Sequence, residues 1–405
     1  MRKSPLLIII LIGLSSLFLY NCGNPTGGGG GGGSVKAIIY VSTSGSDEAG
    51  DGSATHPYKT IQKGLKMVPV GGLVSVETGT YTEEVIWPNT DNITLKGMSQ
   101  TGTIISGDAS SRCVSIESVP NVKNATIRNM TVKNGLCSTN GPGIYFNQAN
   151  AELHLYDVIV SDNSCGGGGG GIYIHDFSST VEAIGCRITN NSAGNGGGVH
   201  LFFGTLILTS CEVSGNHANQ GAGVDARNSG AILILSSCEV FGNTAASDFG
   251  GIACNGGTLI NCLIYNNTAN RYYAGIYSSD TMRIINCTIT SNDAVNDYGA
   301  IAQWGSLTIL NCILWGNTSE ANPVHSELSY LGTLDLKCCD IQGGGYPGTG
   351  SVDIDPLFVS VSDLHFTGSS PTAVTEGGTT EGAPACDRDG KSRTLPYSMG
   401  AFEKN

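Results

Sequence analysis

The chain has 405 residues, 59 of them glycine, and 40% of its residues are hydrophobic while only 13% are charged. This hydrophobic content excludes an acidic disordered chain, and the lack of a strict three-residue glycine period excludes a collagen. Twenty basic and 33 acidic side chains give a net charge of -13. That charge repels phosphate backbones, so nucleic acid is not an expected partner.

The N-terminus predicts export. Basic residues 2–3 precede an apolar run over residues 6–19, which is short for a membrane-spanning helix. The sequence Leu19-Tyr20-Asn21-Cys22 resembles the lipobox of bacterial lipoproteins, although Asn21 stands where Gly, Ala or Ser is usual. The resemblance implies a signal peptide over residues 1–21 and lipidation of Cys22. A plain signal peptide or an uncleaved anchor is the alternative.

A glycine-rich stretch follows the predicted lipidation site. Residues 22–34 include seven consecutive glycines and have no capacity to pack, which predicts a flexible tether between lipid and domain. By family analogy, Gly23 in place of an aspartate implies sorting to the outer membrane or the cell surface. The membrane is then a partner through the lipid anchor only.

A repeat of about 25 residues dominates the middle of the chain. Its pattern is Cys-x-apolar-x-x-Asn, with cysteines at Cys186, Cys211, Cys238, Cys262, Cys287 and Cys312 and degenerate copies at Met130, Asp157 and Cys339. A Gly-x-Gly-Ile motif and an alternating apolar stretch accompany each copy. Each period is therefore expected to hold three short strands.

Repeats of this length cannot bury an apolar face alone, so successive copies must stack as coils. We predict an all-β fold, a single-stranded parallel β-helix of roughly 10 coils. Each repeat cysteine and the residue two positions later should point inward. The Asn five residues after each cysteine should lie at a turn, where its amide pairs with the equivalent amides of neighbouring coils.

Three stretches resemble the right-handed parallel β-helix repeat proteins of the pectate-lyase-like superfamily. They are the entry over residues 40–65, the Gly-Gly-Ile and Asn-terminated repeats, and the exit over 355–403, which is similar to choice-of-anchor Q segments. The repeats are also similar to those of polymorphic outer-membrane adhesins. The resemblance implies right-handed coils over 35–350, an N-terminal capping helix and a C-terminal capping segment over 351–405. It leaves the function open, because this fold hosts lyases, hydrolases, epimerases, adhesins and stalks.

The cysteines fall into two groups. The repeat cysteines form an inward column with parallel Cβ vectors, which suits packing as free thiols better than bridging. Cys137 and Cys165 follow equivalent turns on adjacent coils and are the best disulfide candidates. No metal site is expected at the thiols, because no histidine spacing converges on them.

Calcium is the one cofactor that the acidic residues suggest. Asp47, Glu48 and Asp51, or Asp387 with Asp389, are the candidate ligands. Polar turns at the capped ends are the favoured interpretation, so no cofactor is expected.

Candidate site residues come from the outward positions of the glycine-led strand. On three successive coils these positions hold Tyr173, His175, His200, Phe202, Asp225 and Arg227. Acid, base, cation and aromatic rings together are what a groove that binds or cleaves sugars requires. If the protein is an enzyme, its catalytic candidates are Arg227, His200, Asp225 and His175. An ordinary solvated sheet face is the alternative.

A second outward column lies three residues after each repeat cysteine. It holds Ser214, Phe241, Tyr265, Thr290 and Trp315. Exposed aromatic residues in a row either meet a ligand or are covered. We expect residues 343–405 to cover them along the side of the coils, and residues 355–405 to blunt the open sheet edge at the end.

The sequence favours an exported, surface-tethered lipoprotein that acts as a non-enzymatic display or adhesion module. Its expected partner is a polysaccharide or another ligand of a host, cell or matrix surface. A polysaccharide lyase or glycoside hydrolase that uses the patch from Tyr173 to Arg227 is the alternative. An inert structural stalk is the second alternative.

Overall fold

The computed structural model describes residues 37–108, 110–321, 323, 326–346 and 348–404. The predicted signal peptide over 1–21, the lipidation site Cys22 and the tether over 22–34 lie outside these residues. Within the described ranges, no helix is long and apolar enough to cross a membrane.

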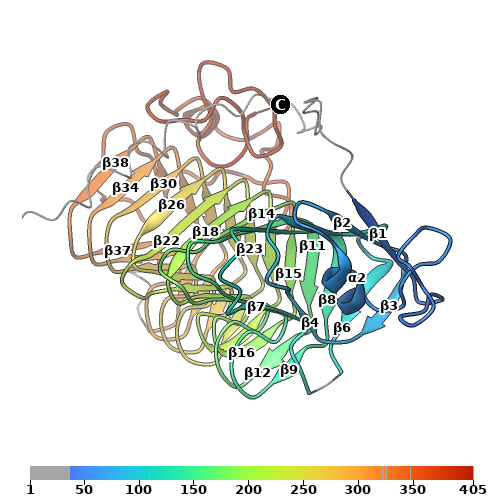
Figure 1. The fold of residues 1–405 in the computed structure, drawn as a ribbon. Helices are drawn as coiled ribbons and strands as arrows, with labels where there is room; N and C mark the ends of the chain where they lie inside the picture. The colour runs from blue at the N-terminus through green and yellow to red at the C-terminus, as the bar shows by residue number, and fades with distance from the viewer. Residues whose placement is uncertain (1–36, 109, 322, 324–325, 347, 405) are drawn as a thin grey trace, which may run out of the picture.

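The chain winds into a parallel β-helix in which each strand pairs in register with the equivalent strand of the next coil (Figure 1). Three sheets, A, B and C, run along the axis. Sheet B has 10 strands and sheet C has 8, each taking one short strand per coil. Sheet A has 21 strands and takes two per coil. The predicted all-β fold and the coil number are confirmed.

The bounds of the strands show how short most of them are. Sheet B contains β4 (Val85–Ile86), β7 (Val114–Glu117), β10 (Ile144–Asn147), β13 (Ile172–Ile174), β17 (Val199–Leu201), β21 (Val224–Ala226), β25 (Ile252–Cys254), β29 (Ile276–Ser278), β33 (Ile301–Gln303) and β37 (Leu328–Tyr330). Sheet C contains β9 (Leu136–Cys137), β12 (Ser164–Cys165), β16 (Ser192–Asn195), β20 (His217–Gln220), β24 (Thr244–Ala245), β28 (Thr268–Ala269), β32 (Asp293–Ala294) and β36 (Thr318–Ser319).

Sheet A contains the longest strands. They are β1 (Ile38–Val41), β2 (Leu73–Val76), β3 (Gly79–Thr82), β5 (Ile93–Gly97), β6 (Thr103–Ser106), β8 (Asn124–Lys133), β11 (Glu152–Ser161), β14 (Thr180–Ile184), β15 (Arg187–Thr189), β18 (Gly204–Thr209), β19 (Glu212–Ser214), β22 (Ala231–Ser236), β23 (Glu239–Phe241), β26 (Gly257–Ile260), β27 (Leu263–Tyr265), β30 (Met282–Ile285), β31 (Thr288–Thr290), β34 (Leu307–Leu310), β35 (Ile313–Trp315), β38 (Leu334–Lys337) and β39 (Asp340–Ile341).

A typical coil therefore has four strands, not the predicted three. One coil runs through β18 and β19 in sheet A, β20 in sheet C and β21 in sheet B. The sequence pattern missed the sheet C strand because most of these strands have only two residues and bury a single small side chain, such as Ala218 or Ala245. Such a strand is too short to show an alternation of apolar and polar residues.

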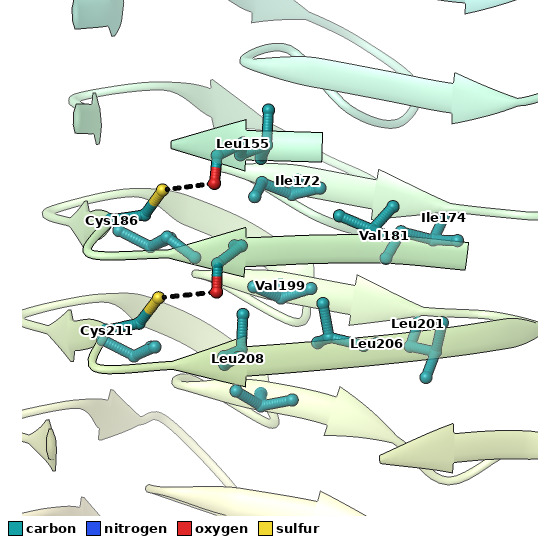
Figure 2. Packing of buried hydrophobic residues seen from close by; sticks show 14 of the residues in the cluster. Leu155, Ile172, Ile174, Val181, Cys186, Val199, Leu201, Leu206, Leu208 and Cys211 are labelled. Atoms are coloured by element: carbon teal, nitrogen blue, oxygen red, sulfur yellow. Dashed lines mark hydrogen bonds between the residues drawn. The ribbon is translucent and has the colours of Figure 1, made fainter. Parts of the chain in front are cut away.

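The repeat cysteines line the core as predicted. Cys186 and Cys211 are buried free thiols, as are their counterparts in later coils. The Cys186 thiol donates a hydrogen bond to the carbonyl of Leu155 in the preceding coil, at 3.5 Å (Figure 2). The residues two positions later, Ile188 and Val213, are fully buried. Packing against backbone carbonyls, and not bridging, thus accounts for the column.

The predicted asparagine ladder is also confirmed. From Asn163 to Asn317, each side-chain amide nitrogen donates to the side-chain oxygen of the equivalent Asn in the next coil, at 2.8 to 3.0 Å. The ladder ends at the buried carboxylate of Glu327, which accepts from the Nδ2 and the backbone N–H of Asn317. A fully paired ladder allows these amides to be buried at every turn.

The predicted capping helix closes the N-terminal end. Helix α2 (Ile61–Met67) lies at the first coils (Figure 1). Ile61 and Leu65, with Val68 just after the helix, are buried in the core cluster of the coils. Thr60 caps the helix by accepting from the N–H of Lys63. These contacts keep the apolar interior of the first coil away from water.

Residues 355–404 lie along the side of sheet A and include the short helix α3 (Thr372–Thr375) (Figure 1). Phe402 and Leu364 bury the ring of Tyr265, and Met399 lies in one cluster with Trp315. The predicted covering of the aromatic column is therefore confirmed.

The end of the helix is closed differently from the prediction. Thr349 and Val352 form bridges with Lys337 and Asp340, and so add a last short rung beyond β38 and β39. Residues 355–404 do not blunt this sheet edge in the described structure, because they turn back along the coils toward β23.

Candidate functional site

The six predicted site residues meet on the outer side of sheet B. Tyr173, His200 and Asp225 occupy one register column of β13, β17 and β21. His175, Phe202 and Arg227 lie just beyond the ends of these strands. The rings of Tyr173 and His200 meet edge to face at 5.4 Å, and those of His175 and Phe202 stack at 5.3 Å. The residues thus form one patch.

Two of the six residues are buried, although outward positions were expected to be exposed. Tyr173 is 5% exposed because Tyr145 stacks on it at 5.5 Å and the patch rings surround it. This burial raises the pKa of Tyr173 to about 12. Asp225 is 2% exposed because Arg227 folds over it. Side chains of neighbouring coils therefore cover part of this face.

Asp225 and Arg227 form a bidentate ion pair. Arg227 Nε and Nη2 each lie 2.8 Å from one oxygen of the Asp225 carboxylate, and Nη1 donates to the side-chain oxygen of Gln220 at 3.1 Å. Burial alone would lower the pKa of Arg227, but the hydrogen bonds to Asp225 raise it. A guanidinium held in this way is a positioned cation and a poor proton acceptor.

His200 packs tightly against the preceding coil. A Cβ at residue 168 would collide with its imidazole, so Gly168 is required for this close approach. Burial lowers the pKa of His200, against the opposing effect of the Asp225 carboxylate. Within the described residues its Nδ1 is buried without a hydrogen-bond partner. His200 is therefore neutral at pH 7 and has no carboxylate that orients it through Nδ1.

A second aromatic cluster extends the patch along the axis. Phe249 stacks on Tyr273 at 5.1 Å, and Tyr273 stacks on Tyr298 at 5.2 Å. The ring of Tyr277 lies 4.8 Å from both Phe249 and Tyr273. Trp304 stands nearly perpendicular to Tyr277 and is 47% exposed, so it presents a ring face to solvent.

Phe249, Tyr273 and Tyr298 adopt an unusual backbone conformation. Their φ angles are 70°, 69° and 68°, in the left-handed region that bulky residues rarely enter. In four earlier coils the equivalent residues are glycines with φ of 59° to 66°: Gly141, Gly169, Gly196 and Gly221. The fold itself thus accepts glycine at this position, and the aromatic residues are an addition to it.

The Cys-x-apolar-x-x-Asn repeat and the outward strand positions do not reveal this second cluster. A signal for it exists, since an aromatic residue stands three positions before the apolar anchor of sheet B in three successive coils. Arg227 joins the two clusters, because its guanidinium carbon lies 4.4 Å from the ring centre of Phe249. We call the continuous surface from Tyr145 to Trp304 the sheet B face.

The two disulfide candidates lie side by side but are free thiols in the structure. Cys137 and Cys165 are register partners in β9 and β12, as their spacing predicts. The predicted disulfide is therefore not formed here. A hydrogen bond between the two thiols lowers the pKa of Cys137 to about 6 and raises that of Cys165.

Four of the five candidate calcium ligands have other partners: Asp389 pairs with His365 at 2.9 Å, and Asp47, Asp51 and Asp387 accept hydrogen bonds. Asp47 accepts hydrogen bonds from the backbone of Lys59 and from Thr60, and Asp51 accepts from the N–H of Ser53. Asp387 accepts from the N–H groups of Asp389 and Lys391. Among the described residues, no group of three or more His, Cys, Asp or Glu side chains is placed to hold a metal ion.

Comparison with known proteins identifies the fold. No protein-family model and no curated protein matches the chain. Among solved structures, a pectate lyase has a TM-score of 0.58 at 13% identity, over 92% of this chain and 98% of that one. A Geobacillus virus E2 protein (TM-score 0.49, 16% identity, 76% and 62% covered) and XylC with xylose (0.46, 10%, 91% and 99%) are less similar. This chain is thus a parallel β-helix protein with the fold seen in pectate lyase.

Proposed function

We propose that the sheet B face binds an extended carbohydrate chain. The protein then serves as a non-enzymatic display or adhesion module, exported and held at the outer membrane or cell surface through a lipidated Cys22. Aromatic rings beside hydrogen-bonding groups are the usual lining of sugar sites. The face crosses seven strands from β10 to β33, and the six spacings between them, at ~4.8 Å each, span about 29 Å, long enough for several sugar rings.

The observation that carries the proposal is the left-handed backbone of Phe249, Tyr273 and Tyr298. A left-handed conformation costs a residue with a Cβ about 1–2 kcal/mol. One stacked aromatic pair stabilises the folded state by about 0.5–1.5 kcal/mol. Since glycine serves at the same position in earlier coils, stability alone gives no reason for three rings here. Such strain is typical of binding and active sites.

The protonation state of the Arg227 guanidinium favours binding without cleavage. A lyase needs a base that can take up a proton, and the bidentate pair with Asp225 raises the pKa of Arg227 instead of lowering it. His200 favours the second candidate function, polysaccharide lyase or hydrolase activity, because its imidazole is neutral at pH 7 and lies beside Tyr173. The two candidates predict different products from the same incubation.

The test is affinity electrophoresis of the full chain in gels that contain neutral or acidic polysaccharides. Tyr273→Gly should retain stability within about 1 kcal/mol, because relief of strain offsets lost stacking, yet weaken binding at least tenfold. Tyr156→Ala, which removes a sheet A ring away from this face, is the matched control and should bind normally.

The same mixtures are examined for shortened chains. Shortening that His200→Ala abolishes would establish the enzyme instead of the binding module. Retarded migration with intact polysaccharide supports the module. If no polysaccharide is bound or shortened, the sheet B face is not a carbohydrate site and a stalk becomes the better description.

A further inference from the structure

Three arginines reach the sheet B face within the described part of the chain. They are Arg112 before β7, Arg227 after β21 and Arg271 before β29. Guanidinium groups are the side chains that best recognise carboxylates and sulfates on an acidic polymer. If these guanidinium groups are free to bind a ligand, the face favours an acidic glycan, and if they are already paired, it favours a neutral one.

Arg227, at the centre of the face, uses all three of its guanidinium nitrogens in hydrogen bonds to neighbouring side chains. Both oxygens of Asp225 accept from it, Gln220 takes its remaining Nη, and Phe249 lies under the guanidinium plane. The Asp225 side chain is 3% exposed. A carboxylate on a sugar would have to displace this buried partner, and would leave Asp225 buried and unpaired.

The two outer arginines also lie beside a carboxylate and an aromatic ring, but at longer nitrogen–oxygen distances than Arg227. Arg112 Nη1 lies 3.4 Å from Glu117, and its guanidinium lies 3.9 Å from the ring centre of Tyr145. Arg271 Nε lies 3.8 Å from Asp248, and its guanidinium lies 5.3 Å from the ring centre of Tyr272. Each arginine on the face therefore has a carboxylate within 4 Å and an aromatic ring beside it.

Further carboxylates lie in loops that follow sheet B strands, with Asp176 two residues after β13 and Asp280 two residues after β29. Asp176 accepts hydrogen bonds from Ser178, and Asp280 accepts from the N–H of Thr281. These groups add negative charge beside a face on which each arginine is already paired with a carboxylate. A polyuronate would meet repulsion here, whereas a sugar that carries only hydroxyl groups would not.

We infer that the glycan taken by the sheet B face is a neutral polysaccharide, not a polyuronate or a sulfated polymer. This inference rests on the proposed function. Trp304 and the tyrosine rings supply apolar contact, and Asn147, Asn255 and Ser279 supply donors and acceptors for hydroxyl groups. A binding surface whose arginines, within the described residues, are each paired with a carboxylate predicts an affinity that salt changes little.

The experiment measures the affinity of the full chain for soluble neutral glycans (xylan, galactomannan and mixed-linkage β-glucan) and for polygalacturonate and alginate. Each is measured at low and high salt, with and without calcium. We expect at least one neutral polymer to bind tenfold more tightly than either polyuronate, with less than a twofold change in affinity between the salt conditions. Equal or tighter binding of a polyuronate in any condition overturns the inference but keeps the proposed function. Absence of binding to every polymer overturns both.

A gain-of-function variant provides the second test. Asp225→Asn keeps the shape of the side chain but frees the charge of Arg227, so it should raise polyuronate affinity at least fivefold, in a salt-sensitive way. Glu212→Gln removes the same charge from the exposed ion pair with Arg187 on sheet A and should change nothing. If Asp225→Asn unfolds, Asp248→Asn frees the more exposed Arg271 and should act in the same direction. A folded variant without any gain contradicts the inference.

Discussion

The guanidinium carbon of Arg227 lies 4.4 Å from the ring centre of Phe249, one coil further along the helix. This contact joins the sequence-predicted patch to an aromatic cluster that the repeat pattern did not reveal. Arg227 also donates to both oxygens of Asp225. The same side chain therefore neutralises a buried carboxylate and contacts an aromatic ring of the sheet B face.

Loss of the Arg227 guanidinium should destabilise the protein strongly. Arg227→Met leaves the carboxylate of Asp225 buried without its partner, and we expect a loss of about 3 kcal/mol in the free energy of unfolding. Urea denaturation measures it. Arg187→Met removes an exposed arginine from a surface pair and should cost less than about 0.5 kcal/mol. Equal losses in the two variants would contradict the importance of the buried pair.

Interruption of the asparagine ladder should be more costly than any surface change. Asn243→Ala removes the acceptor for the N–H and the amide of Asn216 and the donor to Asn267, all fully buried. We expect a loss of about 3 kcal/mol or more, because unpaired buried polar groups keep their desolvation cost. Asn219→Ala, at an exposed position, serves as the control for calorimetry. A change in melting temperature no larger than that of the control would rule out a stabilising ladder.

Stability should depend on pH through the last coil. Burial raises the pKa of both Glu327 and Asp340 to about 7. The folded state therefore binds their protons more tightly than the unfolded chain, so this contribution is complete below about pH 4 and is lost as the pH rises through 7. Urea midpoints between pH 4 and 8 measure the slope.

Asp340→Asn should flatten this pH dependence. The variant keeps an acceptor for the N–H of Ile354 but cannot ionise. Its stability should exceed that of the wild type at pH 8 and approach it at pH 4. Parallel stability curves for the two proteins would show that Asp340 does not titrate near neutral pH.

Oxidation should join Cys137 to Cys165. The two thiols are register partners. Because the pKa of Cys137 is lowered, its thiolate is available to attack an added disulfide oxidant, and Cys165 then completes the bridge. The two thiols lose two protons and two electrons to the oxidant, and the new bridge between residues 137 and 165 should add about 3 kcal/mol of stability. Mass spectrometry after alkylation detects the bridge. Cys165→Ser removes the gain, and continued alkylation of both residues after oxidation would refute the pairing.

The repeating parts of this fold could be predicted from sequence, and the reason is geometric. Cys211 and Asn216 recur at a nearly constant spacing, and in parallel coils a recurring side chain meets its own kind. The same period placed Tyr173, His200 and Asp225 in one column. What recurs in the sequence therefore becomes adjacent in space.

Parts that depend on side chains from other coils could not be predicted. The burial of Asp225 follows from how Arg227 folds back, which no spacing encodes. Phe249 lies at a left-handed position that is glycine in four earlier coils, so the pattern of outward strand positions does not include it, although the aromatic residues at this position are visible in the sequence. Contacts that depend on a side-chain or backbone conformation cannot be predicted from the repeat spacing, and only the structure shows them.

The C-terminal segment along sheet A also bears on cooperativity. Each coil of a solenoid touches only its neighbours, so single coils can open at an end without disturbing the rest. Residues 379–388 cross several coils, from Asn311, just after β34, to Glu239 on β23. This strap makes opening of one rung depend on detachment from several others. We therefore expect the coils that this segment crosses to unfold as one unit, and not to open singly from the end of the solenoid.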